Sequence, residues 1–271
     1  MSLTRKKLGK ELLTITENVF GHSVDATLAL LAYLAAMSVS TLQRNPDLHA
    51  RIASEKFLEQ INYEAIKNAL ITAWKRQYIL KYRHALPEIT QEGKQRLSEL
   101  LPVYDAIRVW DMRLHAITYD VPEKQKSVRD ALRRFLIRVR CAKLQESVWI
   151  TPYNPIDLLR TFVKEKGISG TVIVSDLGKD AAIGEESFSD LVARLFNLKE
   201  INTRYETWLD EYKNERPLSI GYQGLMQYLA ILKSDPQLPF DLLPKWWKGD
   251  TAYQKIKPLY EKVLLAARPR R

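Results

Sequence analysis

Cysteine, histidine and glycine are scarce in this 271-residue chain, and each scarcity excludes a class of protein. The single cysteine, Cys141, excludes an internal disulfide framework and fits a reducing compartment, so we expect a cytoplasmic protein. The four histidines, at positions 22, 49, 84 and 115, have none of the spacings of a zinc site. The 10 glycines form no phosphate-cradling loop. The sequence therefore predicts no resident cofactor and no obvious catalytic set.

Charged residues are absent from the 18 positions between Asp25 and Arg44. A stretch of this length is near the minimum for a membrane span. However, alanine, serine and threonine dilute it, and it has no aromatic belt at its ends. We therefore expect a buried helix in a helical head, with no membrane association.

The net charge is +10, and the basic excess is spread along the chain. Such a charge attracts polyanions but does not name one. A basic surface must therefore come from folding and not from a charged tail.

The first part of the chain, residues 1–104, has the element order of a winged helix-turn-helix. A helix is expected immediately before the segment ILKYRHALPEIT, which reads as a strand, a turn and a second strand. The segment EGKQRLSELLP then closes the domain with another helix. The helices expected before this hairpin lie at 4–20, 25–44, 46–60 and 63–79.

The helix around 63–77 has one face suited to holding it in the domain and one suited to DNA. Its apolar stripe runs to Trp74 and Gln77. Opposite, Asn68 can pair with adenine edges and Lys75 can reach guanine or phosphate. A solvated surface helix, or a winged helix that binds only protein, fits the same spacing. The candidate DNA-binding residues, with the hairpin included, are Glu64, Lys67, Asn68, Thr72, Lys75, Arg76, Lys81, Arg83 and His84.

Residues 105–180 change to a strand-helix-strand-helix-strand order, in which 143–153 reads as one strand. This order is typical of a small ferredoxin-like domain, to which we assign dimerisation. Residues 181–271 are mainly helical and rich in aromatic residues. The expected fold class is therefore α+β, with three consecutive domains: 1–104, 105–180 and 181–271.

Basic side chains gather on the helix expected at 124–140, where seven cations accompany one acid, Asp130. Such a face suits contact with phosphate or with an anionic effector. A solvated basic face paired with neighbouring acids fits the pattern equally well. The candidate effector-binding or phosphate-binding residues are Lys126, Arg129, Arg133 and Arg140.

Two further residues have chemistry worth testing. Asp120 ends the first strand of the ferredoxin-like unit, where it could hold a divalent metal if a symmetry mate supplied a second acid. A structural strand-end role is the favoured interpretation. Cys141 lies between Arg140 and Lys143, whose charges lower a thiol pKa where the thiol is exposed. Without a partner group, we expect this cysteine to be structural.

Several spaced motifs resemble the PaaX family of phenylacetate-degradation repressors. They are WDMRLHAITYDVPEKQKSVRDALRRFL, LQESVWITPY, LFNLKEINTRYETWL and LPFDLLPKWWKGDTAYQKIKPLY. Together they span about residues 105–265. The resemblance implies a homodimeric transcriptional repressor that binds operator DNA and is released by an acyl-CoA effector. It also implies a recognition helix at Tyr63–Gln77. The chain departs from the family in its alanine-rich helix at 26–43 and in a wing that is poor in glycine and arginine.

The middle region is also similar to the small CRISPR-associated adaptation nuclease, a ferredoxin-like dimer whose first strand ends in a metal-binding aspartate. Asp120 matches that aspartate, and Gln145 and Ser147 align with its following strand. The alternative function is therefore a metal-dependent nuclease, or a subunit of a DNA-integration complex, with Mg²⁺ or Mn²⁺ at Asp120. We favour a non-enzymatic regulator that partners double-stranded DNA and a second copy, because the flanking domains belong to the repressors.

Overall fold

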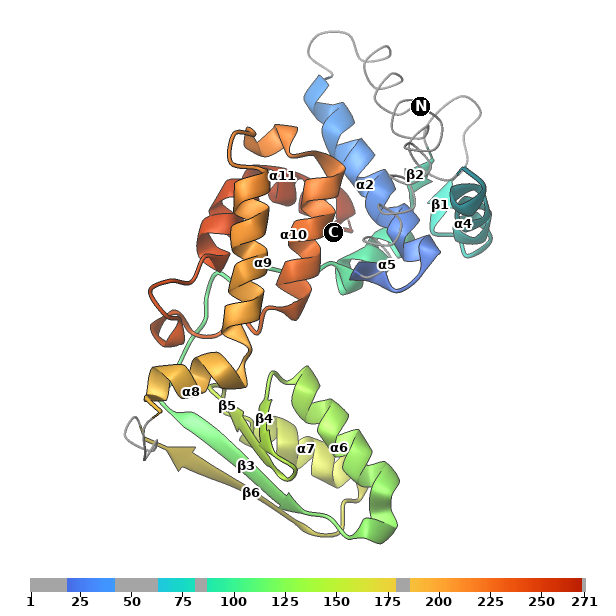
Figure 1. Cartoon of the computed structure of the whole chain (residues 1–271). Helices are drawn as coiled ribbons and strands as arrows, with labels where there is room; N and C mark the ends of the chain where they lie inside the picture. Colours follow the sequence, from blue (N-terminus) through green and yellow to red (C-terminus); the bar gives the residue numbers. More distant parts are fainter. Residues whose placement is uncertain (1–18, 42–62, 81–86, 179–185, 270–271) are drawn as a thin grey trace. The chain divides into compact units, whose positions relative to one another are not determined.

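Segments that are distant in the sequence build each of the two units into which contacts divide the chain (Figure 1). The computed structural model describes residues 19–41, 63–80, 87–178 and 186–269. The first unit holds 1–104, 204–234 and 248–271, and the second holds 105–203 and 235–247. Helices and antiparallel sheets together confirm the α+β class. The expected division into three consecutive domains stays a prediction.

The first unit joins the N-terminal head to helices from the end of the chain. Its β1 and β2 form a short antiparallel hairpin, with Ile79 opposite Ile89. The helix α9 begins in the second unit and continues into the first. The elements of the first unit are α2 (Ser23–Thr41), α4 (Tyr63–Lys75), β1 (Ile79–Leu80), β2 (Glu88–Ile89), α5 (Gln91–Leu100), α9 (Leu198–Glu211), η2 (Pro217–Ser219), α10 (Gly221–Ser234) and α11 (Gly249–Ala267).

The uncharged stretch forms α2, a helix buried on nearly all sides between α4, α5 and α11. Ala29 and Ala32 are almost fully buried, because small side chains let neighbouring helices approach closely. A helix that is apolar all round is a core helix, which confirms the expected burial. Among the described helices, none is long and apolar enough to cross a membrane. The alanine-rich character therefore follows from the packing of α2 against the C-terminal α11 as well as α4.

A tight turn positions the hairpin directly after α4. Gln77 adopts a left-handed conformation (φ 60°), and the Tyr78 N–H donates to the Ala73 carbonyl at 2.9 Å. Thr90 then caps α5: its hydroxyl oxygen accepts from the Gly93 N–H at 3.1 Å and its hydroxyl donates to the Gln77 carbonyl at 2.6 Å. A Cβ at Gly93 would lie 2.2 Å from the Tyr78 carbonyl oxygen. The hairpin is therefore held by α4 on one side and by α5 on the other.

The second unit is built on a four-stranded antiparallel sheet in the order β4-β5-β3-β6. Two helices alternate with the strands in the ferredoxin-like arrangement, as expected. The segment 143–153 is not one strand: it turns at Glu146 and Ser147 into the hairpin β4–β5. The elements are β3 (Leu114–Asp120), η1 (Glu123–Gln125), α6 (Lys126–Arg138), β4 (Ala142–Gln145), β5 (Val148–Thr151), α7 (Ile156–Lys166), β6 (Thr171–Leu177), α8 (Phe188–Leu195) and η3 (Phe240–Leu242).

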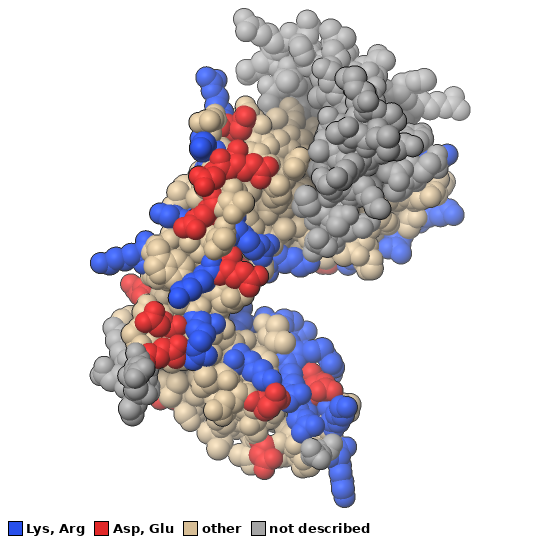
Figure 2. Space-filling model, viewed as in Figure 1, with Lys and Arg blue, Asp and Glu red and all other residues tan. Residues whose placement is uncertain are grey.

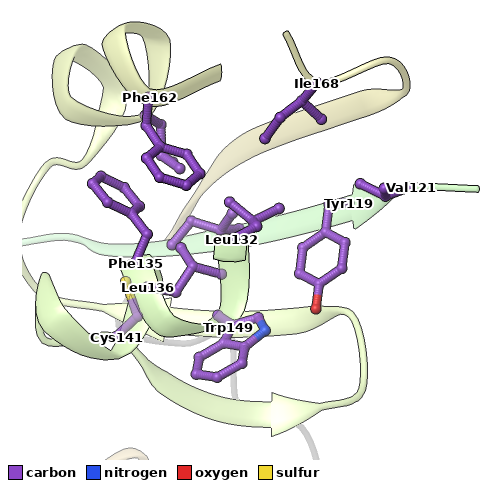
Figure 3. Packing of buried hydrophobic residues seen from close by; sticks show 11 residues of the cluster. Tyr119, Val121, Leu132, Phe135, Leu136, Cys141, Trp149, Phe162 and Ile168 are labelled. Carbon is purple, nitrogen blue, oxygen red and sulfur yellow. The ribbon is translucent and has the colours of Figure 1, made fainter. Parts of the chain in front are cut away.

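The core of the second unit lies between this sheet and the helices α6 and α7 (Figure 3). Phe135 of α6 stacks on Phe162 of α7 with ring centroids 4.2 Å apart. Leu132 and Leu136 are fully buried against Ile117 of β3. The apolar face expected for this basic helix is therefore confirmed, and it fixes which way the cations point.

Cys141 is part of this core, and burial raises the pKa of its thiol to about 12. The thiol therefore stays protonated at pH 8, although a hydrogen bond with Thr151 offsets part of the effect. We expect iodoacetamide to modify the native protein at pH 8 at least about 100-fold more slowly than the urea-unfolded protein. Mass spectrometry of timed samples measures both rates, and equal rates would show that the thiol is accessible.

Candidate nucleic-acid interface

The helix α4 turns one face to the core and one to solvent. Ala69 and Ala73 are buried and lie on the side that packs against α2. Lys67, Asn68 and Lys75 are exposed. A helix used for DNA recognition needs this combination: an inner face that locks its position, and an outer face with side chains that reach base edges and phosphates.

The prediction that the apolar stripe of this helix faces the core is wrong for the C-terminal end of α4. The Trp74 side chain is 48% exposed, and Gln77 lies beyond the helix in the left-handed turn. Ala69 and Ala73 are buried and α4 packs against α2, so the buried face is centred on these small residues. The Trp74 indole therefore lies partly on the outer surface, next to Lys75 in the sequence and two helical turns after Lys67.

The other predicted contact residues divide into three groups. Arg76 is exposed in the turn that follows α4. Thr72 is half-buried, and its hydroxyl donates to the Asn68 carbonyl at 2.8 Å. The Thr72 hydroxyl oxygen can therefore accept a hydrogen bond from a base but cannot donate one. The side chain of Glu64, and the whole of Lys81, Arg83 and His84, lie outside the described residues.

An ion pair with a buried carboxylate and a partly exposed guanidinium links the helices that support this surface. The Arg96 guanidinium of α5 donates to both carboxylate oxygens of Asp25 on α2, with Nε–Oδ1 at 3.1 Å and Nη2–Oδ2 at 2.9 Å. The Asp25 side chain is 3% exposed and that of Arg96 is 36% exposed. Two parallel hydrogen bonds between a guanidinium and a carboxylate fix the relative orientation of the two groups as well as their distance. The helix next to the hairpin is thus oriented against the helix behind α4.

The second unit carries the basic face expected on α6 (Figure 2). Arg129 and Arg133 lie one helical turn apart. Lys126 is exposed at the first position of α6. Arg140 lies past the end of the helix in a left-handed conformation (φ 64°), with its guanidinium carbon 6.0 Å from the centroid of the Tyr153 ring. Lys126, Arg129 and Arg133 therefore follow one another on successive turns of α6, whereas Arg140 lies beyond the end of the helix.

The turn between β4 and β5 supplies partners that the sequence did not reveal. Glu146 accepts from Arg133 Nη2 at 2.7 Å and from Lys143 Nζ at 2.6 Å. The pKa of Glu146 is lowered, above all by its hydrogen bond with Lys143. Arg133 Nε also donates to the Tyr119 hydroxyl at 3.2 Å. The three-residue spacing of Lys143 and Glu146 is the feature of the sequence that could have indicated this ion pair. In a straight strand such a spacing puts the two side chains on opposite faces, so the pair becomes evident only when the turn at Glu146 is known.

Asp120 is exposed at the end of β3, opposite Thr171 of β6. Its carbonyl oxygen comes so close to Gly170 (φ 134°) that a Cβ there would lie 2.3 Å away. Among the described residues, no three histidine, cysteine or acidic side chains come together as a metal site. A metal at Asp120 would therefore require ligands from outside this set, and its role as a ligand stays a prediction.

Two family models match the chain. The PaaX protein central Cas2-like domain matches residues 108–183, and the PaaX-like protein C-terminal domain matches residues 196–269. The first covers most of the second unit, including its sheet and the basic face of α6. The second covers the helices α9, α10 and α11, of which α10 and α11 belong to the first unit.

Individual proteins give a consistent result. A protein of Escherichia coli (strain K12) named transcriptional repressor PaaX is 27% identical over 156 residues, which are 52% of this chain and 49% of that protein. The chain thus spans about half the length of this curated relative. The solved structure of uncharacterized protein Rv0674 from Mycobacterium tuberculosis has a TM-score of 0.51 at 17% identity, covering 77% of this chain and 85% of that one. The latter likeness concerns the fold alone.

Proposed function

Since the chain belongs to the PaaX family, we propose that it is a non-enzymatic transcriptional repressor that binds double-stranded DNA. Its relative in Escherichia coli is named as a transcriptional repressor. The proposal rests on the two faces of α4. Its alanine residues are buried where α4 packs against α2, and Lys67, Asn68 and Lys75 are exposed to solvent. The β1–β2 hairpin follows α4 and contacts it through β1. We assign Asn68 and Lys75 to base edges, and Lys67 and Arg76 to the DNA backbone.

The proposed repressor acts as a homodimer, so that two copies of α4 read two half-sites of a palindromic operator. Dimerisation is assigned to the second unit, whose strand β6 lies at the edge of the sheet and pairs there with β3. An edge strand offers unpaired backbone groups to a second chain. Light scattering coupled to gel filtration tests this: a mass of one chain across micromolar concentrations would contradict the dimer.

The deciding experiment for the repressor is binding to genomic fragments. Sheared DNA is captured with the purified protein and sequenced, and the enriched site is titrated at several salt concentrations. We expect a palindromic site bound tighter than random DNA by about 10³-fold or more. Weak binding that is equal for all sequences would contradict the repressor.

The alternative, a metal-dependent nuclease, is tested with the same DNA. The protein and its Asp120→Asn variant are incubated with DNA and Mg²⁺ or Mn²⁺. We expect the DNA to stay intact with both proteins, because Asp120 is a single exposed carboxylate and metal catalysis needs a fuller ligand set. Cleavage by the parent protein that Asp120→Asn abolishes would overturn the non-enzymatic assignment.

Release of the operator is assigned to a small acyl-CoA-type effector, as the family resemblance implies. The cations of α6 provide the charge that an anionic effector needs. Adding such a compound to the operator complex is expected to weaken binding, and an unchanged affinity across effectors of this class would contradict release by an acyl-CoA.

A further inference from the structure

Donors outnumber acceptors where α6 meets the β4–β5 turn through Arg133 and Glu146. Arg129 and Arg133 stand one turn apart on α6, and Lys143 stands on β4. One carboxylate, that of Glu146, receives both Arg133 and Lys143 at 2.7 and 2.6 Å. Asp130 lies at 3.7 Å from Arg133, too far for a close hydrogen bond. The cations therefore carry more N–H groups than these two acids can accept.

Two buried donors belong to the same elements, one to α6 and one to the strand next to β4. Among the described residues, neither Arg129 Nε nor the Trp149 indole nitrogen has a hydrogen-bond partner. Trp149 is 3% exposed and lies opposite Lys143 in the β4–β5 register. Figure 3 shows its indole nitrogen on the side of the ring toward which the Tyr119 hydroxyl points. Buried donors without acceptors cost free energy, so a group whose acceptor oxygens reached them would recover part of that cost.

We propose that Arg129, Arg133, Lys143 and Trp149 form a binding site for the phosphate or pyrophosphate group of a small molecule, and that Glu146 occupies it in the unliganded chain. We call this the α6–hairpin site. The Tyr119 hydroxyl accepts from Arg133 and donates to the Glu146 carbonyl, so it positions the site without binding the ligand. A phosphate group offers more acceptor oxygens and more negative charge than one carboxylate, and arginine forks match its geometry. The Glu146 side chain is 76% exposed, so it can turn into solvent when a ligand enters.

The occupant is a small molecule because two of the donors are recessed. Arg129 Nε and the Trp149 indole nitrogen are shielded from solvent, and an extended nucleic-acid backbone contacts exposed cations instead. This inference rests on the proposed repressor for its biological purpose: the α6–hairpin site would receive the phosphate end of the effector. The basic face of the second unit would then bind the effector, whereas α4 of the first unit binds the DNA.

The test titrates the full-length protein with inorganic pyrophosphate by isothermal calorimetry at fixed ionic strength. We expect saturable binding that Arg129→Met weakens by about tenfold or more, since a charge-assisted contact is lost. Lys143→Met, at a partly exposed position that does not endanger folding, is expected to weaken it in the same direction. Glu146→Gln is expected to tighten binding several-fold, because the competing negative charge is removed.

The matched control is Arg134→Met, which removes the same charge from an exposed position of the same helix. It is expected to change pyrophosphate affinity by less than about twofold, as for a screened surface charge. Three outcomes overturn the site: no saturable binding, an equal loss in Arg134→Met and Arg129→Met (an adventitious ion only), or no gain in Glu146→Gln.

Operator DNA distinguishes the source of the phosphate and separates this inference from the proposed function. Arg129→Met is expected to leave operator affinity unchanged, and a loss equal to that for pyrophosphate would assign the cations to the DNA backbone and overturn the small-molecule site. Conversely, Lys75→Ala is expected to weaken operator binding and to leave pyrophosphate binding intact. Loss of one property without the other therefore shows which of the two assignments has failed.

Discussion

Replacing Arg96 with methionine is expected to lower the free energy of unfolding by about 3 kcal/mol, because it leaves the buried Asp25 carboxylate without its partner. The Asp25 side chain is 3% exposed and receives two hydrogen bonds from Arg96. Methionine keeps most of the side-chain volume, so the change isolates the charge. We choose the lower end of the usual range because Arg96 itself is 36% exposed and its charge is partly screened.

Urea unfolding followed by circular dichroism measures this effect. The control is Arg160→Met, which breaks the exposed pair with Asp157 (2.8 Å, side chains 73% and 93% exposed) and is expected to cost less than about 0.5 kcal/mol. The double change Asp25→Leu with Arg96→Met is expected to recover much of the loss, since no buried charge remains. Equal effects of Arg96→Met and Arg160→Met would show that the Asp25 pair does not hold α2 and α5 together.

Replacing Lys75 with alanine is expected to weaken operator binding by about 1–3 kcal/mol and to relax the sequence preference at one position. Lys75 is exposed in the last turn of α4, and Ala73, two residues earlier, is fixed against the core. A lysine on a helix held in this way loses little freedom on reaching a base edge or phosphate. Titration against the enriched site and against random DNA, at matched salt, measures both affinities.

Lys213→Ala serves as the control for the loss of one positive charge, since Lys213 is exposed in the turn after α9. It is expected to change operator affinity by less than about 0.5 kcal/mol. If Lys75 contacts phosphate and not a base, binding to random DNA falls by the same factor and the salt slope falls by about 1. Unchanged affinity for both DNAs would remove Lys75 from the interface.

Much of the architecture could be predicted from periodicity alone. The uncharged stretch after Asp25 forms the buried α2, the hairpin after α4 pairs Ile79 with Ile89, and the apolar face of α6 is buried on the sheet. These predictions succeed because each depends on local spacing: an apolar stripe at helical period, or two short β-prone segments around a turn. The spaced motifs of the middle and C-terminal regions indicated the family in the same local way, and the family models confirm it.

Other features depended on which elements meet in space. Trp74 was expected in the core, but the face of α4 that is buried where it packs with α2 is centred on Ala69 and Ala73, and the indole is half exposed. The strand expected at 143–153 folds back at Glu146, and this brings the carboxylate onto Arg133, 13 positions away in the sequence. Neither feature could be predicted from residue spacing alone, because each depends on the element that packs against the segment.

The sequence by itself determined the mixed class, the ferredoxin-like type of the middle region, the family and the outward cations of α4 and α6, because hydrophobic periodicity and local motifs specify each of them. The tertiary structure decided that α2 packs against both the head and the C-terminal α11, that Asp25 pairs with Arg96, and that Arg133 of α6 pairs with Glu146 of the β4–β5 turn. These features depend on contacts between residues far apart in the chain. Close packing and the cost of burying an unpaired charge select such contacts only when the whole chain has folded.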